Sequence, residues 1–393
     1  SDRKIRSEYG PAIGLTPAGE WIVAWSAWRL AYPTGTDVRA GISSDGGVTW
    51  SPPIRLSNGA LNAVDSGPAI APGLQGGIIT WNARNQLPGA MSRDRDIVMR
   101  RTSDLLDIAP IVPLDPTAIQ DGEGLDRDPD VALDARGRGI LVWTTNAGTP
   151  FNTAHDADVV FAATSDFGRA WSSPDRLSAD DDAMGGRADS APRICGSGDG
   201  RWLAAWNRTA APGDPRIGPV VTITLDDGQT WSPPTAVATD QLGTQRVGAC
   251  AAAHLEGPRW LLTWTAEGVS GPDTELIYAI TENDGQTWSS PREFLPDAEL
   301  DTADENNPVI ATGEGGTVMV AVNRPRDIVV VISRDSGFTW SPPQTVATGS
   351  GGPAGLATDR RGLWMIAWRN YSPPGTTIWT VISRDEGATW DAP

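Results

Sequence analysis

Arginine and carboxylate residues gather where short β-rich segments begin or end, and side chains of these types can do chemistry together. An arginine guanidinium binds a ligand carboxylate through two parallel hydrogen bonds, and two carboxyl groups can act as acid and base in glycoside cleavage. Mutual salt bridges between the segments are the structural alternative. The ionisable candidates are Glu8, Tyr9, Arg127, Asp128, Asp156, Arg187, Arg246 and Glu305.

An internal repeat sets the elements that must position these residues. The segment Ser43-Ser-Asp45-Gly-Gly47-Val-Thr49-Trp50 returns five times with its key residues at the same offsets. The later copies end at Trp171, Trp231, Trp288, Trp340 and Trp390. β-rich runs end at Trp25, Trp81, Trp143, Trp206, Trp264 and Trp368, with Val322 in the remaining place. These runs define seven units of roughly 57 residues, a length that suits a four-stranded propeller blade.

Alternation and turn residues predict four antiparallel strands within each unit. In the fourth unit the predicted strands are 191–194, 202–206, 220–224 and 235–237. The repeated segment, which we call the repeat turn, then joins the third strand to the fourth. Its aspartate is expected to accept hydrogen bonds from N–H groups of the turn, and its glycine to take a positive φ.

The sequence therefore predicts an all-β fold, a single seven-bladed β-propeller domain over residues 1–393, built from four-stranded antiparallel blades. The predicted units are 8–57, 58–118, 119–178, 179–238, 239–296, 297–347, and 348–393 together with 1–7. The last unit lacks a fourth strand, and Arg3-Lys-Ile-Arg-Ser7 is similar to Pro53-Ile-Arg-Leu-Ser57. The N-terminal segment is therefore predicted to complete the last blade and close the ring.

The repeat turn resembles the Asp box, or bacterial neuraminidase repeat, of the sialidase family. Six of the seven units carry it, so the resemblance covers nearly the whole chain. It implies a β-propeller whose Asp boxes lie on the face away from the catalytic site. Sialidases have six blades, which makes a six-bladed sialidase fold the alternative.

The resemblance also implies roles for individual residues. Unit three, with Arg127-Asp128-Pro129 followed by Asp156, best matches the sialidase segment that supplies a carboxylate-binding arginine and then an acid/base aspartate. Arg187 and Arg246 are expected to complete an arginine cluster with Arg127. The nucleophile of sialidases is a tyrosine paired with a glutamate, for which Tyr9 with Glu8 or Glu305 is the candidate here. An ordinary hydrogen-bonded role for Tyr9 is the alternative. Trp28, just past a predicted strand, is a candidate for stacking on a sugar ring.

Composition excludes several other functions. A net charge of −18 and a pI near 4.5 argue against nucleic acid as a partner. Two histidines cannot build a three-histidine metal site, so we expect no metal and no cofactor. No apolar run reaches the roughly 18 residues of a membrane span.

The sequence predicts a sialidase-like, exo-acting glycoside hydrolase that acts on an acidic glycan, as a monomer, in a secreted or periplasmic location. The alternative is a non-catalytic propeller that binds glycan or protein through the same face.

Overall fold

The structure is a computed structural model, and the residues that it describes exclude several connecting segments. The described residues are 5–16, 18–29, 35–57, 63–73, 76–84, 95–102, 112–113, 124–146, 157–178, 188–209, 218–237, 247–267, 269, 273–294, 304–348, 350–372 and 375–392.

The chain divides into two compact units. Unit 1 contains Ser1–Ile194 and Tyr371–Ile378, and unit 2 contains Cys195–Asn370 and Trp379–Pro393. The division passes through single strands, and each unit is described by itself below. The prediction of one domain over the whole chain stays a prediction.

The described residues form strands joined by turns. The first thirteen strands are β1 (Ile5–Leu15), β2 (Trp21–Arg29), β3 (Gly35–Ser43), β4 (Ile54–Arg55), β5 (Ser66–Ala71), β6 (Ile78–Ala83), β7 (Asp96–Arg101), β8 (Val112–Pro113), β9 (Arg127–Leu133), β10 (Gly139–Thr145), β11 (Asp158–Thr164), β12 (Asp175–Arg176) and β13 (Asp189–Gly196). The others are β14 (Trp202–Arg208), β15 (Pro219–Thr224), β16 (Thr235–Ala236), β17 (Val247–His254), β18 (Trp260–Glu267), β19 (Thr274–Thr281), β20 (Arg292–Glu293), β21 (Asn306–Thr312), β22 (Val318–Asn323), β23 (Asp327–Ser333), β24 (Gln344–Thr348), β25 (Ser350–Thr358), β26 (Trp364–Ser372) and β27 (Gly375–Ser383).

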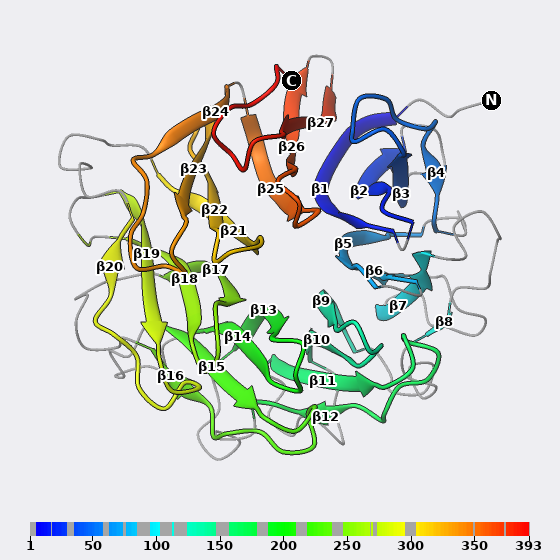
Figure 1. Cartoon of the computed structure of the whole chain (residues 1–393). Helices are drawn as coiled ribbons and strands as arrows, with labels where there is room; N and C mark the ends of the chain where they lie inside the picture. Colours follow the sequence, from blue (N-terminus) through cyan, green and yellow to red (C-terminus); the bar gives the residue numbers. More distant parts are fainter. Residues whose placement is uncertain are drawn as a thin grey trace. The chain divides into compact units, whose positions relative to one another are not determined.

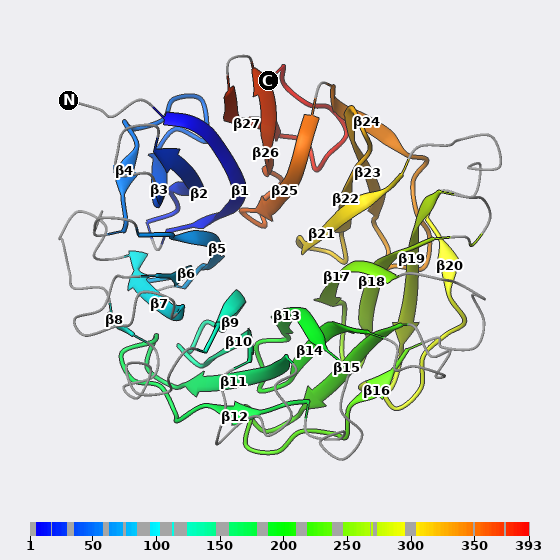
Figure 2. The same cartoon turned by 180° about the vertical axis from the view of Figure 1, so that it is seen from behind.

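Consecutive strands pair into antiparallel sheets, as the repeat predicts. Five sheets have four strands each, β5 to β8, β9 to β12, β13 to β16, β17 to β20 and β21 to β24. In both views, β17, β18, β19 and β20 lie side by side in chain order (Figure 1, Figure 2). Five separate four-stranded sheets differ from the predicted seven, because the strands of the first and last predicted units form one seven-stranded sheet instead. Its order is β25-β26-β27-β1-β2-β3-β4.

The predicted role of residues 3–7 needs correction within the described part of the chain. Residues 5 and 7 pair antiparallel with β2, through Ile5 with Arg29 and Ser7 with Trp28. The pairing of β1 with β27, between Ser7 and Thr376, is parallel. An added fourth strand would run antiparallel to β27. Residues 5–7 therefore begin the first strand of the first sheet, and residues 1–4 lie outside the described residues.

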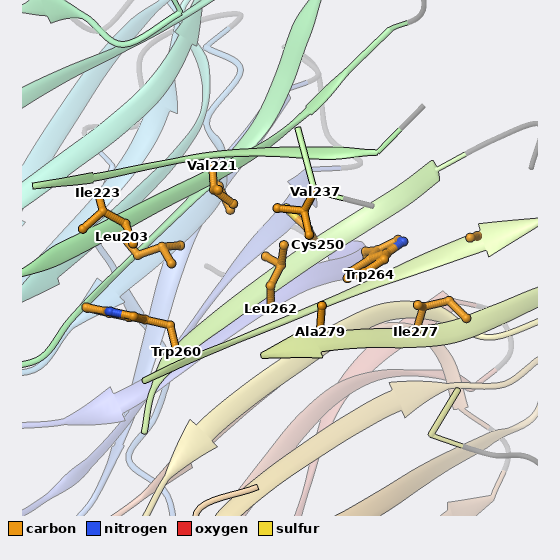
Figure 3. Packing of buried hydrophobic residues seen from close by; sticks show 12 residues of the cluster. Leu203, Val221, Ile223, Val237, Cys250, Trp260, Leu262, Trp264, Ile277 and Ala279 are labelled. Atoms are coloured by element: carbon orange, nitrogen blue, oxygen red, sulfur yellow. The ribbon is translucent and has the colours of Figure 1, made fainter. Parts of the chain in front are cut away.

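Tryptophans at the ends of the second strands fill the space between neighbouring sheets. In unit 2, Trp260 and Trp264 are four residues apart on β18, so they lie on one face, and both are fully buried. They pack with Leu203 and Val221 of the preceding sheet and with Cys250 (Figure 3). Burial of these large rings removes a large apolar area from water and stabilises the contact between sheets. Cys195 and Cys250 are not joined by a disulfide bond.

The repeat turn has the hydrogen bonds that the sequence predicts. The Asp45 carboxylate accepts bonds from the Thr49 N–H (2.9 Å), the Thr49 hydroxyl (2.6 Å) and the Ser43 hydroxyl (2.8 Å). Gly47 has a φ of 88°, and its N–H donates to the Ser43 hydroxyl. These bonds, led by that of the Thr49 hydroxyl, lower the pKa of Asp45 from 3.8 to about 2. The turn is thus closed within a few residues, and its role is structural.

The described residues contain no helix with the length and apolar character needed to cross a membrane.

Candidate functional site

Several first strands contain the same β-bulge near their start. In β9, Asp128 and Pro129 lie between the paired residues Arg127 and Asp130 and face one residue of β10. Asp128 has a φ of 55°, a left-handed conformation that side chains rarely adopt and that a bulge accommodates. A positive φ followed by proline also occurs at Gly10, Gly67, Ala191 and Asn307. The bulge therefore gives the residue before it the same local setting in each of these strands.

An acidic residue lies two positions before each of these bulge residues, and we call this end of a sheet its carboxylate end. The acidic residues are Glu8, Asp65, Asp126, Asp189 and Glu305. Their N–H groups bind the start of a third strand in the preceding sheet. Within unit 1, for example, the Asp65 N–H donates to the Thr36 carbonyl (3.2 Å) and the Asp126 N–H to the Arg95 carbonyl (2.9 Å). The carboxylate end is therefore where neighbouring sheets are tied together.

Arg127 lies at the carboxylate end of the sheet β9 to β12, next to the bulge and paired with Thr144 of β10. Its Nε atom is buried and has no hydrogen-bond partner, and the same holds for the Thr144 hydroxyl. Among the described residues, no carboxylate forms an ion pair with Arg127. Because buried polar atoms are normally hydrogen-bonded, these two atoms are candidates for bonds to a ligand.

Tyr9 lies at the carboxylate end of the first sheet, where its side chain hydrogen-bonds that of Thr36. Burial raises the pKa of the Tyr9 phenol, while the bond to Thr36 and the positive charge of Arg95 act in the opposite direction. Tyr9 is therefore a neutral phenol at physiological pH. As a nucleophile it would need a base to take its proton.

The two glutamates predicted to assist Tyr9 have other partners. The Glu8 carboxylate accepts a hydrogen bond from the N–H of Ile378 (3.3 Å), and the Glu8 N–H donates to the Thr376 hydroxyl (2.9 Å). Glu305, in unit 2, is buried and forms an ion pair with Arg324 at 2.8 Å. A role for either carboxylate beside Tyr9 stays a prediction.

The other candidates differ in how the structure places them. Trp28 lies within β2 rather than beyond it, with 48% of its surface exposed, which leaves a ring face available for stacking. Asp128 is exposed at the bulge. Asp156, Arg187 and Arg246 lie outside the described residues.

Arg95 is a residue of this site that the sequence reasoning missed. It precedes β7 and forms a parallel bridge with Leu125, as Thr36 does with Val64. The residues at the corresponding contacts are Thr36, Ala157, Thr274 and Thr376. Alignment of the third strands shows an arginine at Arg95 where these other repeats have a threonine or an alanine. This difference is the sequence signal that singles out Arg95.

Arg95 and Arg127 are candidate anion-binding residues of unit 1. Among the described residues, neither Arg95 nor Arg127 has a carboxylate partner, so both guanidinium groups are available to a ligand carboxylate. The Tyr9 hydroxyl lies close to the charge of Arg95 and can hydrogen-bond the same ligand. In the described ranges, no three His, Cys, Asp or Glu side chains are grouped so that they could hold a metal ion.

Comparison with known proteins agrees with this fold. Residues 200–393 match the profile of the BNR repeat-like domain family. No curated protein sequence matches the chain.

Several solved structures are similar over nearly the whole chain. A protein of unknown function from Dyadobacter fermentans has a TM-score of 0.56 and 13% identity, with 98% of this chain and 96% of that one covered. An α-L-arabinofuranosidase from Fusarium graminearum has a TM-score of 0.52 and 14% identity, with 98% and 94% covered. A Hadza microbial sialidase has a TM-score of 0.52 and 16% identity over 95% of this chain, which spans 65% of the sialidase's length.

At these identities the structural similarity establishes the fold, which is an all-β propeller. The matched family profile and the repeat turns agree with that fold. The chain is therefore an all-β propeller whose residues 200–393 match the BNR repeat-like domain family.

Proposed function

We propose that the protein is a sialidase-like glycoside hydrolase that binds an acidic glycan at the carboxylate ends of the sheets in unit 1. The observation that carries this proposal is the presence of two arginines, Arg95 and Arg127, without a carboxylate partner among the described residues of a strongly acidic chain. A protein with 49 acidic and 31 basic residues has many carboxylates that could neutralise them. Arginines left unpaired in such a chain fit the binding of a carboxylate from outside.

The predicted residues take the following roles in this proposal. Arg127, with Arg187 and Arg246, holds the sugar carboxylate, and Asp128 and Trp28 contact the ring. The carboxyl group of Asp156 protonates the leaving glycosidic oxygen as the bond to the anomeric carbon breaks. Tyr9 stabilises or attacks that carbon, and water completes hydrolysis, so that one glycosidic bond and one water give two hydroxyl groups.

A non-catalytic glycan-binding propeller is the second candidate, and one set of contacts favours it. The carboxylates of Glu8 and Glu305 are already engaged by Ile378 and Arg324, and burial raises the pKa of Tyr9. A tyrosine nucleophile works best with a free carboxylate beside it. The sialidase and the arabinofuranosidase of similar fold favour hydrolysis, although fold alone does not determine chemistry.

An activity screen over acidic-sugar glycosides separates the two candidates. We expect turnover by the unmodified protein and roughly a hundredfold lower kcat/KM in Asp156→Asn and in Arg127→Ala. Arg136→Ala is the control, since Arg136 lies at the opposite end of the same sheet and is exposed. Equal turnover in all four proteins would remove this site assignment. Binding without turnover, lost in Arg127→Ala, would establish the non-catalytic candidate.

We also propose that the chain forms seven blades and that its first and last blades meet. The single bridge between Ser7 and Thr376 is parallel, like the bridges of Thr36 with Val64 and of Arg95 with Leu125 between successive sheets. In this proposal the seven-stranded sheet consists of two blades, β25 to β27 and β1 to β4. They are joined by the same kind of parallel bridge that joins other successive sheets. We also propose that the protein acts as a monomer, in a secreted or periplasmic location.

A further inference from the structure

A polar pocket lies in unit 2, at the repeat-turn end of the sheet β17 to β20. The cavity measures about 470 Å³, within the range of sites for small ligands. It lies between the repeat turns of the fifth and sixth predicted units. The residues that define its chemistry are Arg259, Glu282, Asn283, Trp288, Arg292 and Phe338.

The chain contains a matched counterpart of Arg259 one sheet earlier. Arg201 precedes Trp202 of β14 as Arg259 precedes Trp260 of β18. Arg201 is neutralised by two carboxylates, with Nη1 at 3.4 Å from Asp284 of the next repeat turn and Nε at 3.5 Å from Asp199. In this counterpart the guanidinium charge is satisfied within the protein.

Arg259 lacks these carboxylates because the next repeat turn has Ser336 where the preceding one has Asp284. Arg259 Nη1 donates to the Ser336 carbonyl (3.1 Å) instead. Its Nε is buried without a hydrogen-bond partner, and the Glu282 carboxylate is 3.8 Å away and 72% exposed. The Arg259 side chain is only 13% exposed and lines the cavity.

The fifth repeat turn has lost a second negative charge at the pocket. It carries Asn283 where the other copies carry aspartate. Two arginines and one glutamate line the pocket, which gives it a net charge of +1 in a chain of net charge −18. The local field therefore favours an anion although the protein as a whole repels one.

Aromatic and hydroxyl groups complete the pocket. The Phe338 ring is 66% exposed, and the Arg259 guanidinium lies 4.0 Å from its centroid. Most counterparts of Phe338 in the other repeat turns are small or polar, as Gln286 is. Trp288, Thr287 and Ser289 also line the cavity. An apolar ring face beside hydroxyl groups suits a sugar ring, whose faces are apolar and whose edges carry hydroxyls.

We propose that this pocket binds a monosaccharide unit that bears a carboxylate. The ligand carboxylate bonds Arg259 and takes the place that Asp284 occupies at the preceding repeat turn. The sugar ring lies against Phe338, and Arg292 supplies a second positive charge. This site is distinct from the proposed site of unit 1, and neither proposal depends on the other.

Titration calorimetry of the full chain with D-glucuronate tests the proposal, with Arg127→Ala as a reference background that lacks the binding arginine of unit 1. Ser336→Asp supplies the internal carboxylate of the counterpart and is expected to lower affinity at least about tenfold. Aspartate fits this backbone, since Ser336 has a φ of 57° and Asp284 one of 50°. Arg259→Gln is expected to cause a similar loss. The matched Arg201→Gln should leave affinity unchanged.

Phe338→Gln introduces the glutamine found at the same place of the preceding repeat turn, and it is expected to weaken binding severalfold. This variant tests the pocket independently if Ser336→Asp fails to fold. D-glucose should bind at least about tenfold more weakly than D-glucuronate, because it lacks the carboxylate. Unchanged affinity in Ser336→Asp and Arg259→Gln, or an equal loss in Arg201→Gln, would overturn the proposal. Equal affinity for cyclohexanecarboxylate would overturn the assignment to a sugar. Activity at the site of unit 1 is measured separately and decides only the proposed hydrolase.

Discussion

The two ends of each sheet satisfy their polar groups in different ways. At the repeat turn, Asp45 finds its partners Ser43 and Thr49 within four residues of the chain. At the carboxylate end, Glu8 bonds Thr376, which is 368 residues away. The first kind of contact can form in a short segment alone, whereas the second requires the rest of the fold.

The difference indicates which end can vary and carry function. Repeat turns reproduce one set of bonds, and their described copies differ mainly at exposed positions such as Phe338. Two carboxylate ends use different partners, a backbone N–H for Glu8 and a guanidinium for Glu305. A scaffold with one variable end suits binding at that end, whereas the pocket proposed at the repeat turns of unit 2 depends on departures from the repeat, namely Asn283, Ser336 and Phe338.

The largest effect is expected when the ion pair of a carboxylate end is broken. Glu305→Ala removes a buried carboxylate and leaves the Arg324 guanidinium without this partner, so the free energy of unfolding should fall by about 3 kcal/mol. Glu256→Ala, at an exposed position of the same unit, is the control. Urea unfolding measures both. Equal loss of stability in the two variants would mean that the ion pair of Glu305 with Arg324 does not stabilise this carboxylate end.

A smaller effect is expected at the contact between β1 and β27. The Thr376 hydroxyl donates to the Glu8 carbonyl (2.7 Å) and accepts from the Glu8 N–H (2.9 Å). Thr376→Val keeps the shape and removes both bonds, which should cost about 1 to 2 kcal/mol of unfolding free energy.

Thr380→Val on the same strand controls for the change of side chain. Thermal and urea unfolding should both rank Thr376→Val as the less stable of the two variants. Equal stability would weaken the proposal that the first and last blades meet through this contact.

The same contrast explains how far the sequence could predict the structure. The repeat turn repeats within eight residues, so its place between third and fourth strands and the positive φ of Gly47 are confirmed. The strands predicted for the fourth repeat unit, residues 179–238, are confirmed as β13 to β16, with ends that differ by at most two residues. Both results rest on local patterns of alternation and turn residues.

Contacts between distant residues could not be predicted in this way. The parallel bridge of Ser7 with Thr376 follows no pattern in either segment, so residues 5–7 were wrongly expected to form an outer strand. The partner of Glu305 is an arginine that follows the next strand along the chain, and Arg95 was overlooked. The contact of Ser7 with Thr376 is decided by how distant strands pack, and that of Glu305 with Arg324 by the register of β21 on β22, neither of which a short window of sequence contains.

The smallest effect is expected at a repeat turn, and it depends on pH. Hydrogen bonds led by that of the Thr339 hydroxyl lower the pKa of Asp335 from 3.8 to about 2. Because the folded pKa lies below the unfolded one, the carboxylate stabilises the fold above about pH 5. That contribution is lost as pH falls through 3.8 toward 2. Asn283 holds the equivalent place, accepting from the Thr287 N–H and donating to the Thr287 hydroxyl, both at 2.9 Å.

Asp335→Asn should therefore fold normally and be destabilised less at pH 7 than Thr376→Val is. When the pH falls from 5 to 2.5, the free energy of unfolding should decrease less in Asp335→Asn than in the unmodified protein. The reciprocal variant, Asn283→Asp, should add to the loss of stability in acid, because it introduces one more carboxylate with a low pKa. Urea midpoints at several pH values measure both changes. Parallel acid profiles for all three proteins would mean that the charge of the aspartate adds nothing to the turn, and that its geometry alone, which asparagine also provides, holds this end of the sheet.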